Sequence, residues 1–148
     1  MLFQAEASAL GVSDFVDFLH YIPDSEMRCL FQQGTLFVMP SISEGFGIPV
    51  LEAMACGLPV AASSSTCLQE VGGEAARYFD PFSIEDIAAT MREILDAPAL
   101  QAKMSEQGRI QSRKFHPNVV REQVRSFWTE LGLGDAAKPA SGKHNQSW

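Results

Sequence analysis

Positive charge and long apolar runs are both scarce in this sequence. Eleven Lys and Arg residues stand against 18 Asp and Glu residues, and the net charge of −7 argues against a nucleic-acid surface, which is normally basic. Acidity alone does not exclude an anionic ligand, because backbone amides can bind phosphate. No apolar run approaches the roughly 20 residues that span a bilayer, since Glu52, Gly57 and Pro59 break the longest ones. We therefore expect neither a nucleic-acid partner nor an integral membrane segment.

Cysteine is also rare, and its placement excludes the usual disulfide and zinc patterns. Cys29, Cys56 and Cys67 form no CxxC pair and have no histidine at metal-ligand spacing. They are typical of reduced thiols packed as small hydrophobic groups. The N-terminal stretch MLFQAEASAL also lacks the basic start of a signal peptide. These features favour a cytoplasmic protein without a metal.

What remains is an ordinary globular composition, with 46% hydrophobic and 20% charged residues in a chain of 148. Apolar runs alternate with helical patterns as far as residue 81. The expected strands are 15–20, 35–39, 59–62 and 77–79, and the expected helices are 1–10, 24–33, 49–56, 68–71, 83–95, 98–115 and 117–131. Run 35–39 is predicted to be buried on both faces. The alternation predicts an α/β fold, a Rossmann-like parallel sheet flanked by helices, with further helices at the C-terminus.

In parallel sheets, ligands bind beyond the carboxyl ends of the strands, which directs attention to loops 20–24, 40–48 and 62–67. The middle loop contains SEGFGIPVLE, in which Glu44 and Glu52 flank a glycine turn. Gly45 and Gly47 allow unusual backbone angles and close approach of a ligand. The helix that begins near Ile48 leaves its first amides without intrahelical partners, so this loop is predicted to seat an anion such as phosphate.

The two glutamates allow two interpretations. Glu44 precedes the turn and could accept hydrogen bonds from neutral hydroxyls, while Glu52 could accept a pair from a ribose. Together they would suit a ligand built as sugar, diphosphate and ribose. Alternatively, Glu44 is a solvated loop acid and Glu52 complements the helix dipole, and spacing alone favours this simpler alternative.

A family resemblance favours the first interpretation. The segment LFVMPSISEGFGIPVLEAMACGLPVAAS resembles the donor-binding motif of retaining GT-B glycosyltransferases of the "glycosyl transferases group 1" type, family 4. That motif has two glutamates separated by seven residues, as Glu44 and Glu52 are here. LGVSDFVDFLHYIPDSEMRCLF and SSSTCLQEVGGEAARYFDP resemble the segments on either side. The resemblance implies a partial GT-B C-terminal domain over residues 1–131, and we expect 132–148, which lack periodicity, to form a disordered tail.

The resemblance also implies a role for each motif residue. Glu44 would be the catalytic residue and would contact hydroxyls of the donor sugar, and Glu52 would bind the ribose of the nucleotide. Backbone groups would complete a site for a nucleotide-diphosphate sugar, with no further cofactor. These are the amides of Gly45, Phe46 and Gly47 along the sugar and phosphate, those of Ile48, Val50 and Leu51 at the helix start for the diphosphate, and Ile22 against the base. His20 and Gln69 depart from the family pattern, which has glycine and proline there.

The resemblance implies an arginine and a lysine that reach the diphosphate from early in the C-terminal domain, and an N-terminal Rossmann-like domain that binds the acceptor. The basic residues here, such as Arg28, Arg77 and Arg92, match no such position. Without cationic groups on the departing diphosphate, and with no DxD pair for a metal, we expect little transfer by this chain alone. The expected partners are therefore a donor, an unknown acceptor, and the N-terminal GT-B domain or a partner chain. The alternatives are a non-catalytic binding or scaffold module and, less favoured, a sugar-nucleotide epimerase relative or a receiver-like or dinucleotide-binding domain.

Overall fold

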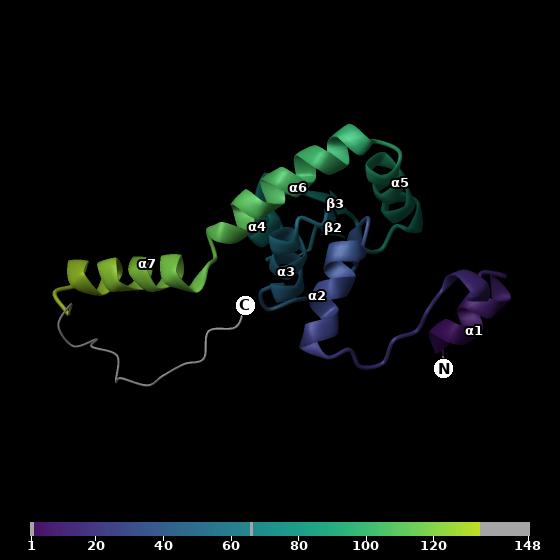
Figure 1. The fold of residues 1–148 in the computed structure, drawn as a ribbon, viewed down its shortest axis with the longest axis horizontal. Coiled ribbons are helices and arrows are strands. Elements are labelled where there is room, and N and C mark those ends of the chain that lie inside the picture. Colours follow the sequence, from purple (N-terminus) through teal and green to yellow (C-terminus); the bar gives the residue numbers. More distant parts are fainter. Residues whose placement is uncertain (1, 66, 134–148) are drawn as a thin grey trace.

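The computed structural model describes residues 2–65 and 67–133 (Figure 1). Three parallel strands form one sheet, and helices pack on both of its faces. The elements are α1 (Leu2–Ala9), the 3₁₀ turn η1 (Ser13–Phe15), α2 (Asp24–Gln33), β1 (Phe37–Met39), α3 (Ile48–Cys56), β2 (Val60–Ser63), α4 (Leu68–Gly72), the 3₁₀ turn η2 (Gly73–Ala75), β3 (Ala76–Phe79), α5 (Ile84–Leu95), α6 (Pro98–Arg113) and α7 (Pro117–Glu130). This arrangement confirms the predicted α/β fold class and all seven predicted helices.

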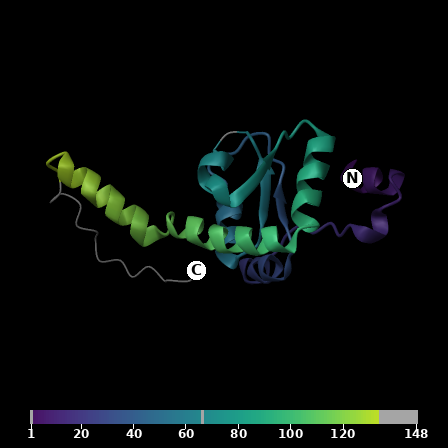
Figure 2. The same cartoon turned by 90° about the horizontal axis from the view of Figure 1, so that it is seen from above.

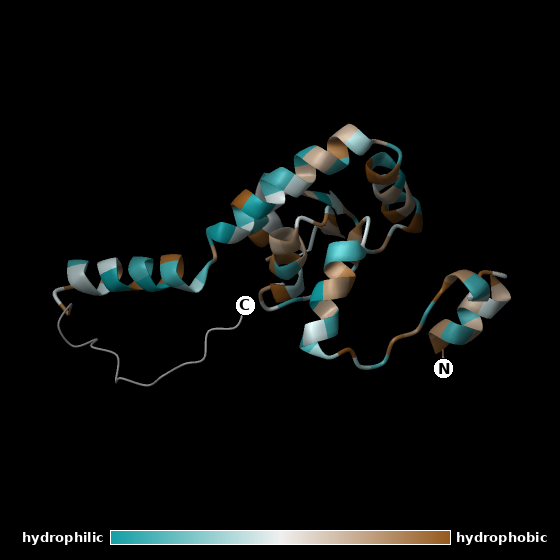
Figure 3. Cartoon of the chain, viewed as in Figure 1, coloured by the Kyte–Doolittle hydropathy of each residue, from teal (hydrophilic) through white to brown (hydrophobic). Residues whose placement is uncertain are grey.

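The sheet has the order β1-β2-β3, and each connection contains a helix. β2 is the central strand, and the pleat sends its alternate side chains to opposite faces. Val60 and Ala62 belong to a core with α2, α3 and α4, while Ala61 belongs to a second core with α5 and α6. Figure 3 shows hydrophilic and hydrophobic residues alternating around α2 and α5, as expected for helices with one face on a core.

Two strand predictions need correction. The predicted strand 15–20 does not form, because residues 13–15 make a 3₁₀ turn and the following extended residues pair with no strand in the described part of the chain. Phe15 is 88% exposed, so its apolar character reflects no core position. Run 35–39 does contain β1, and each face of this strand meets a core: Phe37 packs against the core that includes Val60, and Val38 against the core that includes Ala61. Both side chains are only half-buried, since β1 is an edge strand of the described sheet, so burial on both faces is partial.

The helix boundaries follow the sequence signals closely. The Ser83 hydroxyl accepts a hydrogen bond from the Asp86 amide at 3.1 Å and so caps α5. The Asp86 carboxylate does not bond back to the Ser83 amide, as it would in a capping box, and instead accepts from the Asp80 amide at 2.7 Å. At the end of α3, Gly57 has φ +79°, a left-handed conformation that suits glycine. The predicted tail lies outside the described residues from position 134 onward.

α6 runs antiparallel to α3 and carries the chain from one end of the α3 helix to the other. In the C-terminal half of α6, the Arg109 side chain lies over Gly57 at the end of α3, and Gly108 packs on Met54. The Gln111 side chain then donates to the Val71 carbonyl oxygen at 2.9 Å. α7 continues beyond α6 and buries no residue, and Figures 1 and 2 place α7 and α1 at opposite ends of the central body.

Tyr78 ties β3 to the turn that follows α4. Its hydroxyl donates to the Gly73 carbonyl oxygen at 2.8 Å. Burial raises the pKa of the Tyr78 hydroxyl from its ordinary value of 10.0 to about 12. The native state therefore holds this proton more tightly than the unfolded chain does.

We expect the free energy of unfolding to fall as the pH rises from 10 to 12, because the unfolded tyrosine loses its proton first. The stabilisation is fully present below pH 10. Tyr78→Phe should remove this part of the pH dependence and lower stability at neutral pH by about 1 kcal/mol, the typical value of one hydrogen bond. Urea unfolding at pH 8 and pH 11 measures both effects. Tyr21→Phe, at a tyrosine that is 85% exposed, is the control. The same pH dependence in wild type and Tyr78→Phe would contradict the assignment.

Candidate functional site

The glycine turn follows β1 and leads directly into α3, at the carboxyl edge of the sheet. Gly47 is the N-cap of α3, with φ +89° and ψ +42°, and a Cβ at this position would lie 2.5 Å from Leu68 Cδ2. Both the backbone angle and the contact require glycine there. A Cβ on Gly45, in contrast, would meet nothing within 4 Å, so this side of the turn is open.

The start of α3 presents amides toward the same edge. Ile48 is the first helical residue, and Pro49, the second, has no amide hydrogen to lose. The Val50 amide donates to the Gly47 carbonyl oxygen at 3.0 Å, and α-helical geometry pairs the Leu51 amide with that same oxygen. The Ile48 amide is therefore the donor most available to a ligand, with Val50 and Leu51 able to share theirs. This geometry suits an anion.

Glu44 and Glu52 are both half-buried. Neither carboxylate makes a hydrogen bond or an ion pair with any part of the chain that the structure describes. Glu52 lies four residues after Ile48, which is 55% exposed, so the two residues share one face of α3. The acceptor capacity of both carboxylates is thus free to meet a ligand.

Ile22 lies at the same edge of the sheet, although the strand predicted before it, 15–20, does not form. α2 and α3 each end just before a parallel strand begins, so both helices begin at the carboxyl edge. Ile22 is half-buried and stands two residues before α2, which packs on α3. His20 is exposed and caps no strand, because no strand forms at 15–20.

Two residues near the turn were missed in the sequence. The Cys67 thiol donates to the Glu44 carbonyl oxygen at 3.4 Å, which links the loop after β1 to the start of α4. The Phe115 ring meets the Phe46 ring edge-on, with centroids 5.8 Å apart. Neither pair has a local sequence signal, because its members are brought together only by the packing of α4 and α6 on α3.

Other surface features lie away from the turn. One shallow hollow runs along α7 beside Val119, Gln123 and Phe127, and a second lies beside Thr35 and Pro59, at the amino ends of β1 and β2. Among residues 2–65 and 67–133, no three His, Cys, Asp or Glu side chains come together in a way that could hold a metal ion. Within the same ranges no helix has the length and apolarity needed to cross a membrane. All three cysteines are free thiols.

Comparison with known families gives a match to glycosyl transferases group 1 over residues 2–111. A curated relative, O-antigen chain mannosyltransferase B of Escherichia coli, is 37% identical over 101 residues. The match takes in 68% of this chain and 26% of the relative, so the chain spans about a quarter of that protein's length.

Solved structures agree on the fold. Sucrose-phosphate synthase from Thermosynechococcus elongatus superposes with a TM-score of 0.79 at 25% identity, covering 90% of this chain and 34% of the synthase. Anabaena HepE, solved in complex with UDP and glucose, superposes with a TM-score of 0.78 at 22% identity, covering 88% of this chain and 36% of HepE. In both cases this chain corresponds to about a third of the larger protein.

Proposed function

Because the chain belongs to the glycosyl transferases group 1 family, we propose that it is the donor-binding half of a glycosyltransferase that uses a nucleotide-diphosphate sugar. One observation carries the proposal. The left-handed Gly47 begins α3 at the carboxyl edge of the sheet, and the two glutamates that flank this start in the sequence, Glu44 and Glu52, are half-buried and have no partner in the described chain. An anion seat flanked by two hydroxyl acceptors matches a diphosphate with a sugar at each end.

In this proposal the diphosphate lies at the amides of Gly45, Phe46, Gly47 and Ile48. The amides of Val50 and Leu51 would be shared between a phosphate oxygen and the Gly47 carbonyl oxygen. This arrangement stabilises negative charge with backbone dipoles and needs no lysine.

The two carboxylates act on the two ends of the ligand. Glu52, on the second turn of α3, accepts the paired hydroxyls of the ribose, and Glu44, before the turn, accepts hydroxyls of the donor sugar. A hydrogen bond to a charged group is worth about 1.5–3 kcal/mol, so each contact is large enough to measure separately. Ile22, at the start of α2, offers backbone groups to the base.

The reaction proposed for the complete enzyme is retaining sugar transfer without a metal, in the cytoplasm. This chain alone would transfer little, because the family resemblance assigns none of its basic residues to the diphosphate. Arg77 pairs with Glu93 at 3.0 Å, while Arg28 and Arg92 are exposed on α2 and α5. A cation on the departing diphosphate is a major term in such reactions. It would have to be supplied by the early part of a complete C-terminal domain or by a partner chain.

The proposal is tested by titrating UDP, GDP and their hexose conjugates into the chain by isothermal calorimetry, and by assaying the same mixtures for release of free sugar or nucleotide. We expect saturable binding of at least one nucleoside diphosphate, together with negligible release. A chain that binds none of the four, while remaining folded by circular dichroism, would contradict the proposed donor site.

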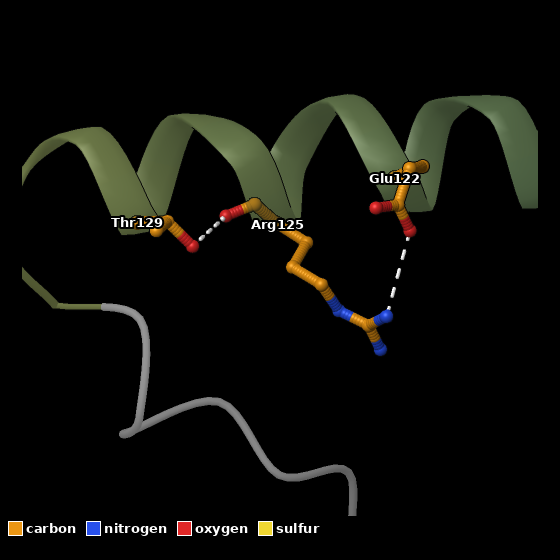
Figure 4. Close-up of polar contacts among 3 residues, drawn as sticks. All are labelled: Glu122, Arg125 and Thr129. Carbon is orange, nitrogen blue, oxygen red and sulfur yellow. Dashed lines mark hydrogen bonds and ion pairs between the residues drawn. The ribbon is translucent and has the colours of Figure 1, made fainter.

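A second function, a non-catalytic binding or scaffold module, is favoured by α7. Its apolar side chains are exposed, at Val119, Val120, Val124, Phe127 and Trp128. Arg125 forms an exposed ion pair with Glu122 at 3.4 Å, and its carbonyl oxygen accepts from the Thr129 hydroxyl at 3.0 Å (Figure 4). The apolar face would cover the N-terminal domain or a partner chain.

Sedimentation analysis separates the two functions: a monomer that binds nucleotide supports the enzyme half, and a stable oligomer that binds none supports the scaffold.

A further inference from the structure

We propose that Phe115 is a positioning residue for the turn Glu44–Gly47: its ring holds Phe46 and so fixes the turn that presents the α3 amides. The inference deepens the proposed function, since it names what keeps the anion seat in shape. It rests on the ring contact between Phe46 and Phe115, with centroids 5.8 Å apart and planes at 77°. Edge-on pairs of this kind contribute beyond the area that they bury.

Phe115 follows α6, a helix that is held firmly against the rest of the domain. α6 is fastened to the body by Gly108 on Met54 and by the Gln111 side chain on the Val71 carbonyl oxygen. After the helix ends at Arg113, the Phe115 amide donates back to the Ser112 carbonyl oxygen at 3.1 Å. The Phe115 backbone therefore has a position set by α6, independently of the turn that its ring contacts.

The turn itself is weakly held on its open side. Gly47 packs tightly on Leu68, and the Glu44 carbonyl oxygen receives the Cys67 thiol, a weak donor, at 3.4 Å. Phe46 is 45% exposed, and a Cβ on Gly45 would meet nothing within 4 Å. The Phe115 contact thus acts on Phe46, whereas Leu68 and Cys67 act on Gly47 and Glu44.

The arrangement makes Phe115 a link between the turn and the direction of α7. Phe115 is followed by His116, whose Nδ1 caps α7 by accepting from the Asn118 amide at 3.3 Å, and by Pro117. α7 therefore begins two residues after the ring that contacts the turn. A change in the course of the chain at 115–117 would act on the turn through that ring.

Limited proteolysis with chymotrypsin tests the inference without any ligand, because Phe46 is itself a cleavage site. In Phe115→Ala we expect cleavage after Phe46 to become about three- to tenfold faster, the factor that corresponds to loss of one aromatic pair. Cleavage after Phe15, which is 88% exposed, normalises protease activity. Cleavage after Phe79, which is 1% exposed in β3, reports global unfolding and should not rise in parallel.

Two further variants sharpen the result. Phe115→Tyr keeps the ring and should restore the wild-type rate. Phe127→Ala removes an edge-on pair of similar geometry within α7, with Trp128 at 5.9 Å, and should leave cleavage after Phe46 unchanged. An unchanged rate in Phe115→Ala, or an equal rise after Phe46 and Phe79, would overturn the inference.

Nucleotide binding is measured on the same proteins with UDP as the probe. Weaker UDP binding by Phe115→Ala, by a similar three- to tenfold, supports the positioning of the seat. If the wild-type chain binds no UDP or GDP while cleavage after Phe46 responds as expected, the proposed function fails and the positioning of the turn by Phe115 stands.

Discussion

Glu52→Gln is expected to weaken binding of UDP by about tenfold or more, and to reduce the preference for UDP over 2′-deoxy-UDP. The substitution keeps the size of the side chain and removes the charge, so each ribose hydroxyl exchanges a charge-assisted bond of about 1.5–3 kcal/mol for a neutral one of about 0.5–1.5 kcal/mol. Glu52 is half-buried on α3 and makes no ion pair with the described residues, so its loss should disturb the fold little. Calorimetric titration of the wild type and the variant with both nucleotides provides the measurement.

Glu44→Gln is the matched control for that experiment. It should leave UDP binding unchanged and lower only the additional affinity that a UDP-sugar has over UDP, because Glu44 is proposed to contact the sugar. If Glu52→Gln binds UDP as tightly as the wild type, Glu52 only complements the helix dipole and the ribose role is wrong.

Gly47→Ala is expected to reduce the free energy of unfolding by about 2–5 kcal/mol and to abolish nucleotide binding. A left-handed conformation costs a non-glycine residue roughly 1–2 kcal/mol, and overpacking of a core typically adds 1–3 kcal/mol. Both apply here, because Gly47 has φ +89° and its new Cβ would lie 2.5 Å from Leu68, which is 0% exposed. Leu68 is fully buried, so relief of the contact requires movement of its side chain or of the turn, and a shift of the turn would carry the Ile48 amide with it. Urea unfolding and UDP titration measure the two effects.

Two other glycines separate the contributions. Gly11→Ala introduces a side chain at φ +69° with nothing within 4 Å, and should show the backbone cost alone. Gly45→Ala lies in the same turn, with open space around the new Cβ, and should change stability by less than about 1 kcal/mol. Equal stability of Gly47→Ala and Gly45→Ala would contradict the packing described for Gly47.

The helices and the glycine turn could be predicted because their signals are local. Ser83 caps α5, Gly57 ends α3 in a left-handed conformation, and Pro49 lies in the first turn of α3. Each of these depends on residues within a few positions along the chain. The order of helices and strands then followed from their alternation.

The failures arose where burial depends on distant partners. Residues 15–20 have strand-forming side chains, but in the described chain they meet no strand to pair with, and Phe15 remains exposed. β1 is apolar throughout, yet its position at an edge leaves Phe37 half-buried. Hydrophobicity shows that a segment can be buried, whereas the neighbours decide whether it is.

The same distinction applies to the candidate site. The motif residues from Glu44 to Glu52 are adjacent in sequence, so their grouping was predictable, and their roles toward a ligand remain proposals. Phe115 is 69 positions beyond Phe46, and only the antiparallel course of α6 along α3 brings the two rings together. No spacing rule in the sequence indicates such a contact.

The most direct measurement is a titration of the ¹⁵N-labelled chain with UDP, followed through its backbone amide resonances. The account predicts that the resonances of Gly45, Gly47 and Ile48 shift first and saturate together, with inorganic pyrophosphate reproducing part of the shift. If the shifts fall instead along the α7 hollow near Val119 and Phe127, or spread evenly over the chain, the start of α3 is not where this protein holds a diphosphate.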